Sequence, residues 1–118
     1  MESYAPVSIT TSAQWSHPTA TQTLRTTDGV DLYATVRGSG TTAIVVVHGF
    51  TGGHRHGSFQ RLLGWLADSF MVVAIDMRGH HFSQGRCTLG HLEAYDVDAA
   101  VLWARQLGAE QVFTLGFS

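Results

Sequence analysis

The sequence predicts an α/β fold in which an antiparallel hairpin precedes a parallel β-α-β-α-β unit. Three short apolar runs are typical of strands covered on both faces, and two longer segments between them have the apolar spacing of helices. Strands that alternate with helices indicate a parallel sheet with crossover connections. The 118 residues are enough for one small domain.

The hairpin is predicted from a strand in which apolar and more polar residues alternate, which is the period of a half-buried strand. Its apolar residues are Val30, Leu32, Ala34 and Val36. Asp28-Gly29 lies between this strand and the one before it, and it favours a tight turn because glycine accepts positive φ. We expect an irregular lead-in over residues 1–20 and the domain over residues 21–118.

The first two buried strands are predicted over Ala43–Val47 and Phe70–Ile75, with Asp76 directly after the second. A glycine-rich turn, His48–Gly53, follows the first strand. The helix between the strands has apolar residues at i, i+3, i+4 and i+7. They are Phe59, Leu62, Leu63 and Leu66.

The second helix is predicted over Leu92–Leu107 and is capped by Gly108. Five of its residues are expected to face inward. They are Leu92, Tyr95, Ala99, Leu102 and Trp103. A third buried strand is predicted over Gln111–Leu115, and Gly116-Phe117-Ser118 follows it.

Chemistry in a parallel sheet sits at the carboxyl ends of the strands, and His48–Gly53, Asp76–Gly85 and Gly116–Ser118 all lie there. A serine hydroxyl is a poor nucleophile unless it is exposed, oriented and paired with a base. A sharp strand-to-helix turn presents such a serine, and a glycine two residues earlier removes a side-chain clash. Gly116-x-Ser118 fits half of that pattern, so Ser118 is the candidate nucleophile.

Acyl transfer also needs amide donors aimed at the developing oxyanion. The turn after Val47 can offer one, because Phe50 or Thr51 would point its backbone N–H into the same crevice. The glycines of this turn let the chain pass close to a substrate.

Three segments resemble consecutive signatures of the α/β-hydrolase family in order and spacing. They are His48-Gly-Phe-Thr-Gly52, Asp76-Met-Arg-Gly-His80 with Ser83, and Leu115-Gly-Phe-Ser118. The stretch 96–105, followed by Leu107-Gly108, is similar to the helix before the nucleophile strand in small bacterial esterases and S33-aminopeptidase-like members. The resemblance covers about Leu24 to Ser118.

This resemblance implies the N-terminal part of an α/β-hydrolase sheet. It implies a serine hydrolase that acts on an ester, thioester or amide by acyl transfer through Ser118. The backbone N–H of Phe50 would belong to the oxyanion hole, with Thr51 beside the substrate. The partner would be a small-molecule substrate, and no cofactor or metal is implied.

Two features depart from the family pattern. The loop after the second strand usually reads Gly-His-Gly-x-Ser, whereas His81 replaces its second glycine here. The sequence also stops at Ser118, before the acid and the base that follow the serine in this family. We therefore expect the chain alone to be inactive and poorly stable, with an exposed apolar edge strand. An inactive truncated product of such a gene is the alternative.

Two other functions share parts of this pattern. A strand, a glycine-rich turn, a helix, a strand and Asp76 imitate a dinucleotide-binding unit, but Gly49-x-x-Gly52-Gly53 is not the Gly-x-Gly-x-x-Gly fingerprint. The order His48, Asp76, Ser118 imitates chymotrypsin-like proteases, whose two β-barrels lack the helices predicted here.

Several polar residues have structural interpretations. His48 is interpreted as a turn residue, and Asp76 as a loop anchor that pairs with nearby backbone or Arg78. Four histidines near the strand ends lack the spacing and acidic partners of known metal motifs. They are His54, His56, His80 and His81.

The composition narrows the function classes further. The chain has no lysine, which excludes P-loop and Schiff-base chemistry. The net charge of −2 gives no indication of nucleic acid or an acidic membrane surface as partner. Cys87 is the only cysteine, and neither a signal peptide nor a membrane span is predicted, so we expect a cytoplasmic protein. The oligomeric state is left open.

Overall fold

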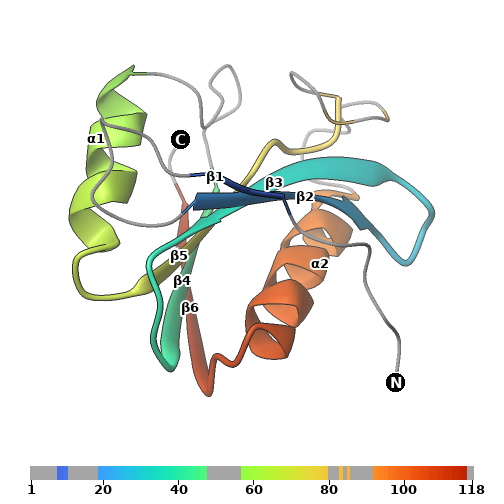
Figure 1. Cartoon of the computed structure of the whole chain (residues 1–118). Coiled ribbons are helices and arrows are strands. Elements are labelled where there is room, and N and C mark those ends of the chain that lie inside the picture. Colours follow the sequence, from blue (N-terminus) through green and yellow to red (C-terminus); the bar gives the residue numbers. More distant parts are fainter. Residues whose placement is uncertain are drawn as a thin grey trace.

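A computed structural model describes residues 8–10, 19–47, 57–79, 83, 85 and 92–116. It contains one six-stranded sheet in the order β1-β2-β3-β5-β4-β6 (Figure 1). The strands are β1 Ser8–Thr10, β2 Thr19–Arg25, β3 Asp31–Arg37, β4 Thr42–Val47, β5 Met71–Ile75 and β6 Gln111–Gly116. The helices are α1 Gly57–Leu66 and α2 Glu93–Gln106. The predicted α/β class and the predicted order of elements are confirmed.

The hairpin of β2 and β3 closes around a three-residue loop. The Thr26 N–H donates to the Val30 carbonyl at 2.9 Å, and the Gly29 N–H donates to the Thr26 carbonyl at 3.0 Å. Gly29 has a φ of +88°, the left-handed conformation that ends this loop type. The predicted turn is therefore confirmed, and it aligns Arg25 with Asp31 across the two strands.

The described part of the expected lead-in differs from the sequence-based expectation. Ser8–Thr10 forms β1, an antiparallel partner of the start of β2, and β2 itself begins at Thr19. Backbone pairing with a neighbouring strand orders these residues although their sequence has no apolar period. The division of the chain at residue 20 stays a prediction.

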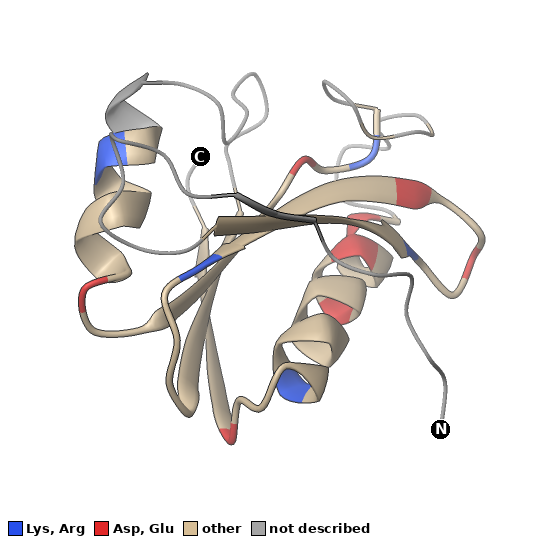
Figure 2. Ribbon diagram, in the orientation of Figure 1, with Lys and Arg blue, Asp and Glu red and all other residues tan. Residues whose placement is uncertain are grey.

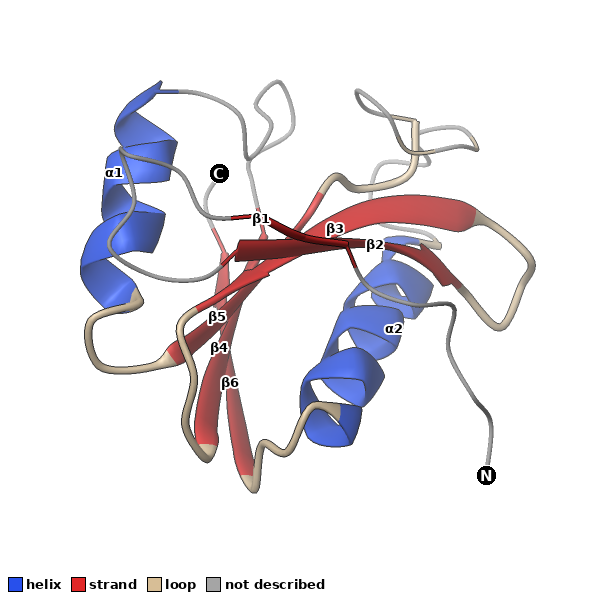
Figure 3. Cartoon of the chain, in the orientation of Figure 1, coloured by secondary structure: helices blue, strands red, loops and turns tan. Residues whose placement is uncertain are grey.

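Two hydrophobic clusters cover the two faces of the sheet, and α1 and α2 lie on opposite sides of it (Figure 3). Alternate residues of β4 point to opposite faces. Val45 packs with Trp103 and Ala100 of α2, whereas Val46 packs with Leu63 of α1. Because both faces are covered, every residue of β5 is buried, as predicted for a parallel strand.

The third parallel strand is predicted in the right place. It is not buried as its apolar run alone predicts, and it forms the exposed apolar edge strand expected for this chain. β6 lies at the edge of the described sheet, where Phe113 is 58% exposed and Leu115 is 36% exposed. An apolar run indicates a strand, but burial also requires a second neighbouring strand and a covering helix on each face.

The predicted inward face of α2 is also partly wrong. Tyr95 and Leu102 are exposed, and the buried stripe instead runs through Asp96, Ala100 and Trp103, joined by Ala104. Asp96 on this buried face accepts hydrogen bonds from Arg78, which compensates the burial of its charge. The cap is confirmed, since Gly108 has a φ of +112° and its N–H donates to the Arg105 carbonyl at 3.0 Å. No helix among the described residues is long and apolar enough to cross a membrane.

Candidate active site

The carboxyl ends of β4, β5 and β6 meet at one level of the sheet. Val47, the last residue of β4, pairs with Ile75 on one side and with Gly116 on the other. Neighbouring strands lie about 4.8 Å apart. The three chemically informative segments therefore leave the sheet from adjacent positions, as the sequence predicts.

The strand order places a topological switch point at this edge. The chain first crosses from β4 to β5 on one side, and then crosses back over β4 to β6 on the other side. Ligands bind at the carboxyl ends of parallel strands where such an order reverses. In the dinucleotide-binding fold the third strand would lie beyond the second, so the arrangement of β5, β4 and β6 contradicts that alternative.

The residues predicted to carry the chemistry lie outside the described part of the chain. These are the nucleophile Ser118, the oxyanion-hole residue Phe50 and its neighbour Thr51. His48 and the four histidines considered as metal ligands also lie outside it. Within the described ranges, no group of three His, Cys, Asp or Glu residues is placed to hold a metal ion.

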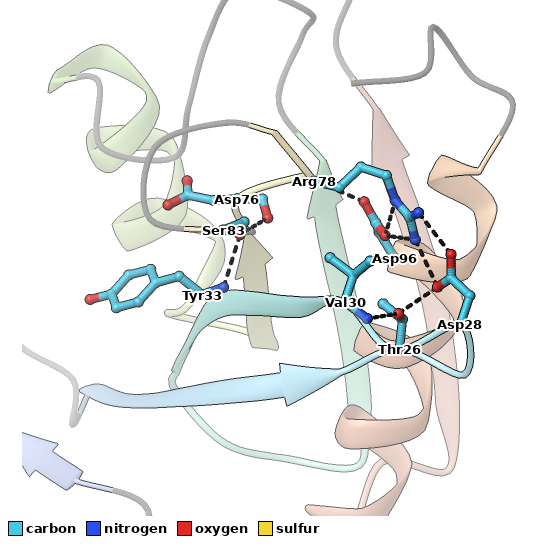
Figure 4. Close-up of polar contacts among 8 residues, drawn as sticks. All are labelled: Thr26, Asp28, Val30, Tyr33, Asp76, Arg78, Ser83 and Asp96. Atoms are coloured by element: carbon cyan, nitrogen blue, oxygen red, sulfur yellow. Dashed lines mark hydrogen bonds and ion pairs between the residues drawn. The ribbon is translucent and has the colours of Figure 1, made fainter. Parts of the chain in front are cut away.

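Asp76 is the described polar residue that follows β5 at this edge. Asp76 is fully buried, and its backbone N–H donates to the Tyr33 carbonyl of β3 at 2.9 Å. The Ser83 hydroxyl donates to the Asp76 carbonyl and accepts the Tyr33 N–H at 2.9 Å (Figure 4). The predicted role as a loop anchor is thus supported at the main chain.

Arg78 binds two carboxylates that come from distant segments. Asp96 of α2 accepts the Arg78 backbone N–H at 2.8 Å and its Nε–H at 2.9 Å. Asp28 of the hairpin turn accepts two bonds from the guanidinium fork, at 2.8 and 3.0 Å (Figure 4). Because Arg78 is only 2% exposed, we interpret it as a structural cation rather than a substrate-binding one.

Figure 2 shows where the charged residues lie along the ribbon, with acidic residues at the hairpin turn and along the first half of α2. The hydrogen bond from Arg78, helped by one from Thr26, lowers the pKa of Asp28 to about 2. The bonds to Asp28 and then to Asp96 hold the pKa of Arg78 above its usual range. The Arg78–Asp28 pair is therefore ionised at neutral pH, and the turn, the β5 exit and α2 are joined by charge-assisted bonds.

Sequence reasoning missed the roles of Asp28 and Asp96. One signal was present, because Asp96, Ala100 and Trp103 stand at i, i+4 and i+7 and therefore share one face of the helix. The other two residues of that face are small or apolar. A carboxylate within a buried helical stripe requires a cation, and Arg78 directly follows a buried strand. No comparable signal marked Asp28, because aspartate is common in tight turns and its presence there does not predict a charged partner.

The structure resembles several solved hydrolases that are longer than this chain. Over 97% of this chain and 46% of the other, it superposes on an esterase from Pyrococcus furiosus with a TM-score of 0.80 and 21% identity. A serine hydrolase without a lid from Xanthomonas campestris gives a TM-score of 0.74 and 22% identity, over 85% and 50% of the two chains. A Vigna radiata epoxide hydrolase mutant gives 0.67 and 21%, over 83% and 30%.

These identities establish the shared fold and not a shared activity. The chain spans about half of the length of the first two of these proteins, and no curated protein matches it in sequence. The sequence model of the family described as alpha/beta hydrolase fold matches residues 42–118, which run from β4 to the last residue and make up more than half of the chain. The chain therefore belongs to the α/β-hydrolase fold family.

Proposed function

We propose that the protein is a serine hydrolase that cleaves a small-molecule ester, thioester or amide through Ser118. The observation that carries this proposal is the switch point between β4 and β6. Val47 and Gly116 are paired there, and the segments that contain Phe50 and Ser118 begin within one residue of that pair. This register supports a nucleophile and an oxyanion donor that converge from two adjacent strands.

In the proposed reaction, the Ser118 Oγ attacks the substrate carbonyl carbon while a base takes its proton. The backbone N–H of Phe50 donates to the resulting oxyanion, and Thr51 contacts the substrate. Collapse of the tetrahedral intermediate expels the alcohol, thiol or amine, and water then hydrolyses the acyl-enzyme. The family order places the acid and the base after the serine, so the proposed reaction requires an acid and a base that would follow Ser118.

The identity of residue 118 separates this proposal from the chemistry of one structural relative. An epoxide hydrolase shares the fold, which means that the fold does not choose between the two reactions. A serine at this turn supports acyl transfer, whereas epoxide and haloalkane hydrolysis by this fold use a carboxylate nucleophile. We also propose a cytoplasmic location and a place among small esterases or S33-aminopeptidase-like members.

The experiment is covalent labelling of the native protein with a fluorophosphonate. The Ser118 Oγ would form a bond to phosphorus, fluoride would leave, and the proton would pass to the base. Trypsin cleaves after Arg105, so the adduct is expected on the peptide that begins at Gln106. Ser118→Ala should abolish both labelling and turnover of p-nitrophenyl esters, while the exposed Ser39→Ala should change neither. Labelling or turnover that persists in Ser118→Ala would contradict the proposal.

A further inference from the structure

The antiparallel pairing of β3 and β5 ends at a position with unusual hydrogen bonding. Its last strand pair is Ala34 with Ile75, so Tyr33 lies opposite Asp76. The Asp76 N–H donates to the Tyr33 carbonyl at 2.9 Å, which marks this position as a hydrogen-bonded pair. Such a pair normally exchanges two bonds, and the second would run from the Tyr33 N–H to the Asp76 carbonyl.

The Ser83 hydroxyl takes the place of that second bond. Its Oγ accepts the Tyr33 N–H at 2.9 Å, and it donates its own proton to the Asp76 carbonyl (Figure 4). Both backbone groups are therefore satisfied, but through an inserted oxygen. Because two bonds now span the distance of one, the two strands are held apart at this position on one side only.

The cluster of Arg78, Asp28 and Asp96 holds the segment that directly follows β5 through a second set of contacts. The Arg78 backbone N–H is bonded to Asp96 at 2.8 Å, and the guanidinium is bonded to Asp28. Asp76 and Arg78 are two residues apart, so the exit of β5 is tied to β3 by Ser83 and to α2 and the hairpin turn by Arg78. Ile75, directly before this exit, pairs with Val47, directly before the segment that contains Phe50.

We propose that Ser83 is a positioning residue of the hydrolase. Its hydroxyl sets the direction in which β5 leaves the sheet, directly beside the end of β4, the strand that leads to the proposed oxyanion residue Phe50. This inference rests on the proposed function, but the hydroxyl bridge itself does not. Ser83→Ala removes the bridge, and Ser83→Thr keeps a hydroxyl at the same carbon.

The first measurement is amide hydrogen exchange of Tyr33 in the native protein, with the Val73 amide in the buried centre of β5 as internal reference. Loss of one hydrogen bond in Ser83→Ala should speed exchange at Tyr33 by about 10-fold or more and leave Val73 unchanged. Ser83→Thr should restore slow exchange. Equal acceleration at both amides, or none at Tyr33, would overturn the bridge and the proposal with it.

The second measurement is the concentration dependence of fluorophosphonate labelling. For a positioning residue, we expect Ser83→Ala to lower the maximal labelling rate about 10-fold or more at an unchanged half-saturating probe concentration. Ser83→Thr should recover that rate, and Ser39→Ala should match the wild type. An unchanged maximal rate in Ser83→Ala, despite fast exchange at Tyr33, would overturn the positioning role. If wild-type Ser118 is not labelled, the proposed function fails and this role falls with it, while Tyr33 exchange still decides whether the bridge exists.

Discussion

β5 and β6 are both short apolar strands that pair in parallel with β4, yet their burial differs completely. All five residues of β5 are buried, whereas β6 contains no buried residue. β5 lies between β3 and β4 and is covered on both faces. β6 pairs with β4 alone among the described strands, and it is the strand farthest from the hairpin (Figure 1).

The two faces of β6 explain its exposure. Val112 packs against the cluster under α2. Phe113 pairs with Ile44, whose side chain belongs to the α1 face, but α1 packs over β5 and leaves the end of that face uncovered. We therefore expect two strands with similar sequences to contribute differently to the free energy of unfolding, because their neighbours differ. Mutations at matched positions can test how large that difference is.

The largest expected effect is on the buried strand. Ile75→Ala should lower the free energy of unfolding by about 2–5 kcal/mol, because the site is fully buried and a cavity would remain. Phe113→Ala removes a larger side chain but should cost less than about 1 kcal/mol, because Phe113 is mostly exposed. Chemical denaturation of both variants measures the two values. An equal loss at both positions would show that β6 is as well packed in solution as β5.

The next effect concerns the turn that leads from β3 into β4. Gly38 has a φ of +71°, and a Cβ there would lie 2.6 Å from the Phe70 carbonyl oxygen and 2.8 Å from that of Ala67. Gly40 also has positive φ, but a Cβ would contact nothing within 4 Å. Gly38→Ala should therefore destabilise the protein by about 1–3 kcal/mol more than Gly40→Ala.

Thermal and chemical unfolding of both glycine variants provide the measurement. Both glycines have positive φ, but Gly38 at +71° lies nearer the left-handed well than Gly40 at +127°, so a larger loss at Gly38 reports the close approach of the chain after α1 to the turn between β3 and β4. Equal destabilisation would mean that the two carbonyls move aside without cost.

The strands and the order of elements could be predicted because alternation and apolar runs are local signals. The face of α2 could not, since the burial of Asp96 depends on Arg78, which lies 18 residues earlier. The exposure of β6 depends on strand order, which no local window contains, so it was expected only from the family resemblance and not from the apolar run itself. Local pattern thus predicts where an element is, and tertiary neighbours decide which side of it is buried.

For the candidate site, too, the location could be predicted but the contacts could not. The edge where β4, β5 and β6 end follows from the alternation of strands and helices. The contacts that shape this edge do not, because Arg78 with Asp28 and Tyr33 with Ser83 each join residues 50 positions apart. The roles of Ser118, Phe50 and Thr51 stay predictions.

A smaller effect distinguishes the two Arg–Asp pairs of the hairpin. Asp28 binds the buried Arg78, whereas Asp31 binds Arg25, whose side chain is 67% exposed. The pKa of Asp28 is about 2 in the folded protein, below its ordinary value of 3.8, so the unfolded chain binds the proton more readily. The stability that this carboxylate contributes is present above about pH 4 and is lost as the pH falls toward 2.

Asp28→Asn should therefore be less stable than the wild type at pH 7, and the difference should shrink between about pH 4 and pH 2. Asp31→Asn is the matched control, and at pH 7 its cost should stay below about 1 kcal/mol, as for other exposed pairs. Urea titrations across this pH range measure both. A difference for Asp28→Asn that is constant from pH 7 to pH 2 would contradict the lowered pKa.

The smallest effect on stability is expected at the surface of β6, where association should change instead. Phe113→Lys places a charge on an exposed apolar edge strand, which opposes strand-to-strand pairing between molecules. We expect the free energy of unfolding to change by less than about 1 kcal/mol, and concentration-dependent association in sedimentation velocity to fall. Trp65→Lys on α1 is the control, since Trp65 is 70% exposed but lies on a helix. If Trp65→Lys reduces association and Phe113→Lys does not, the exposed helix and not the edge strand holds the molecules together, and the contrast between β5 and β6 is confined to packing within one molecule.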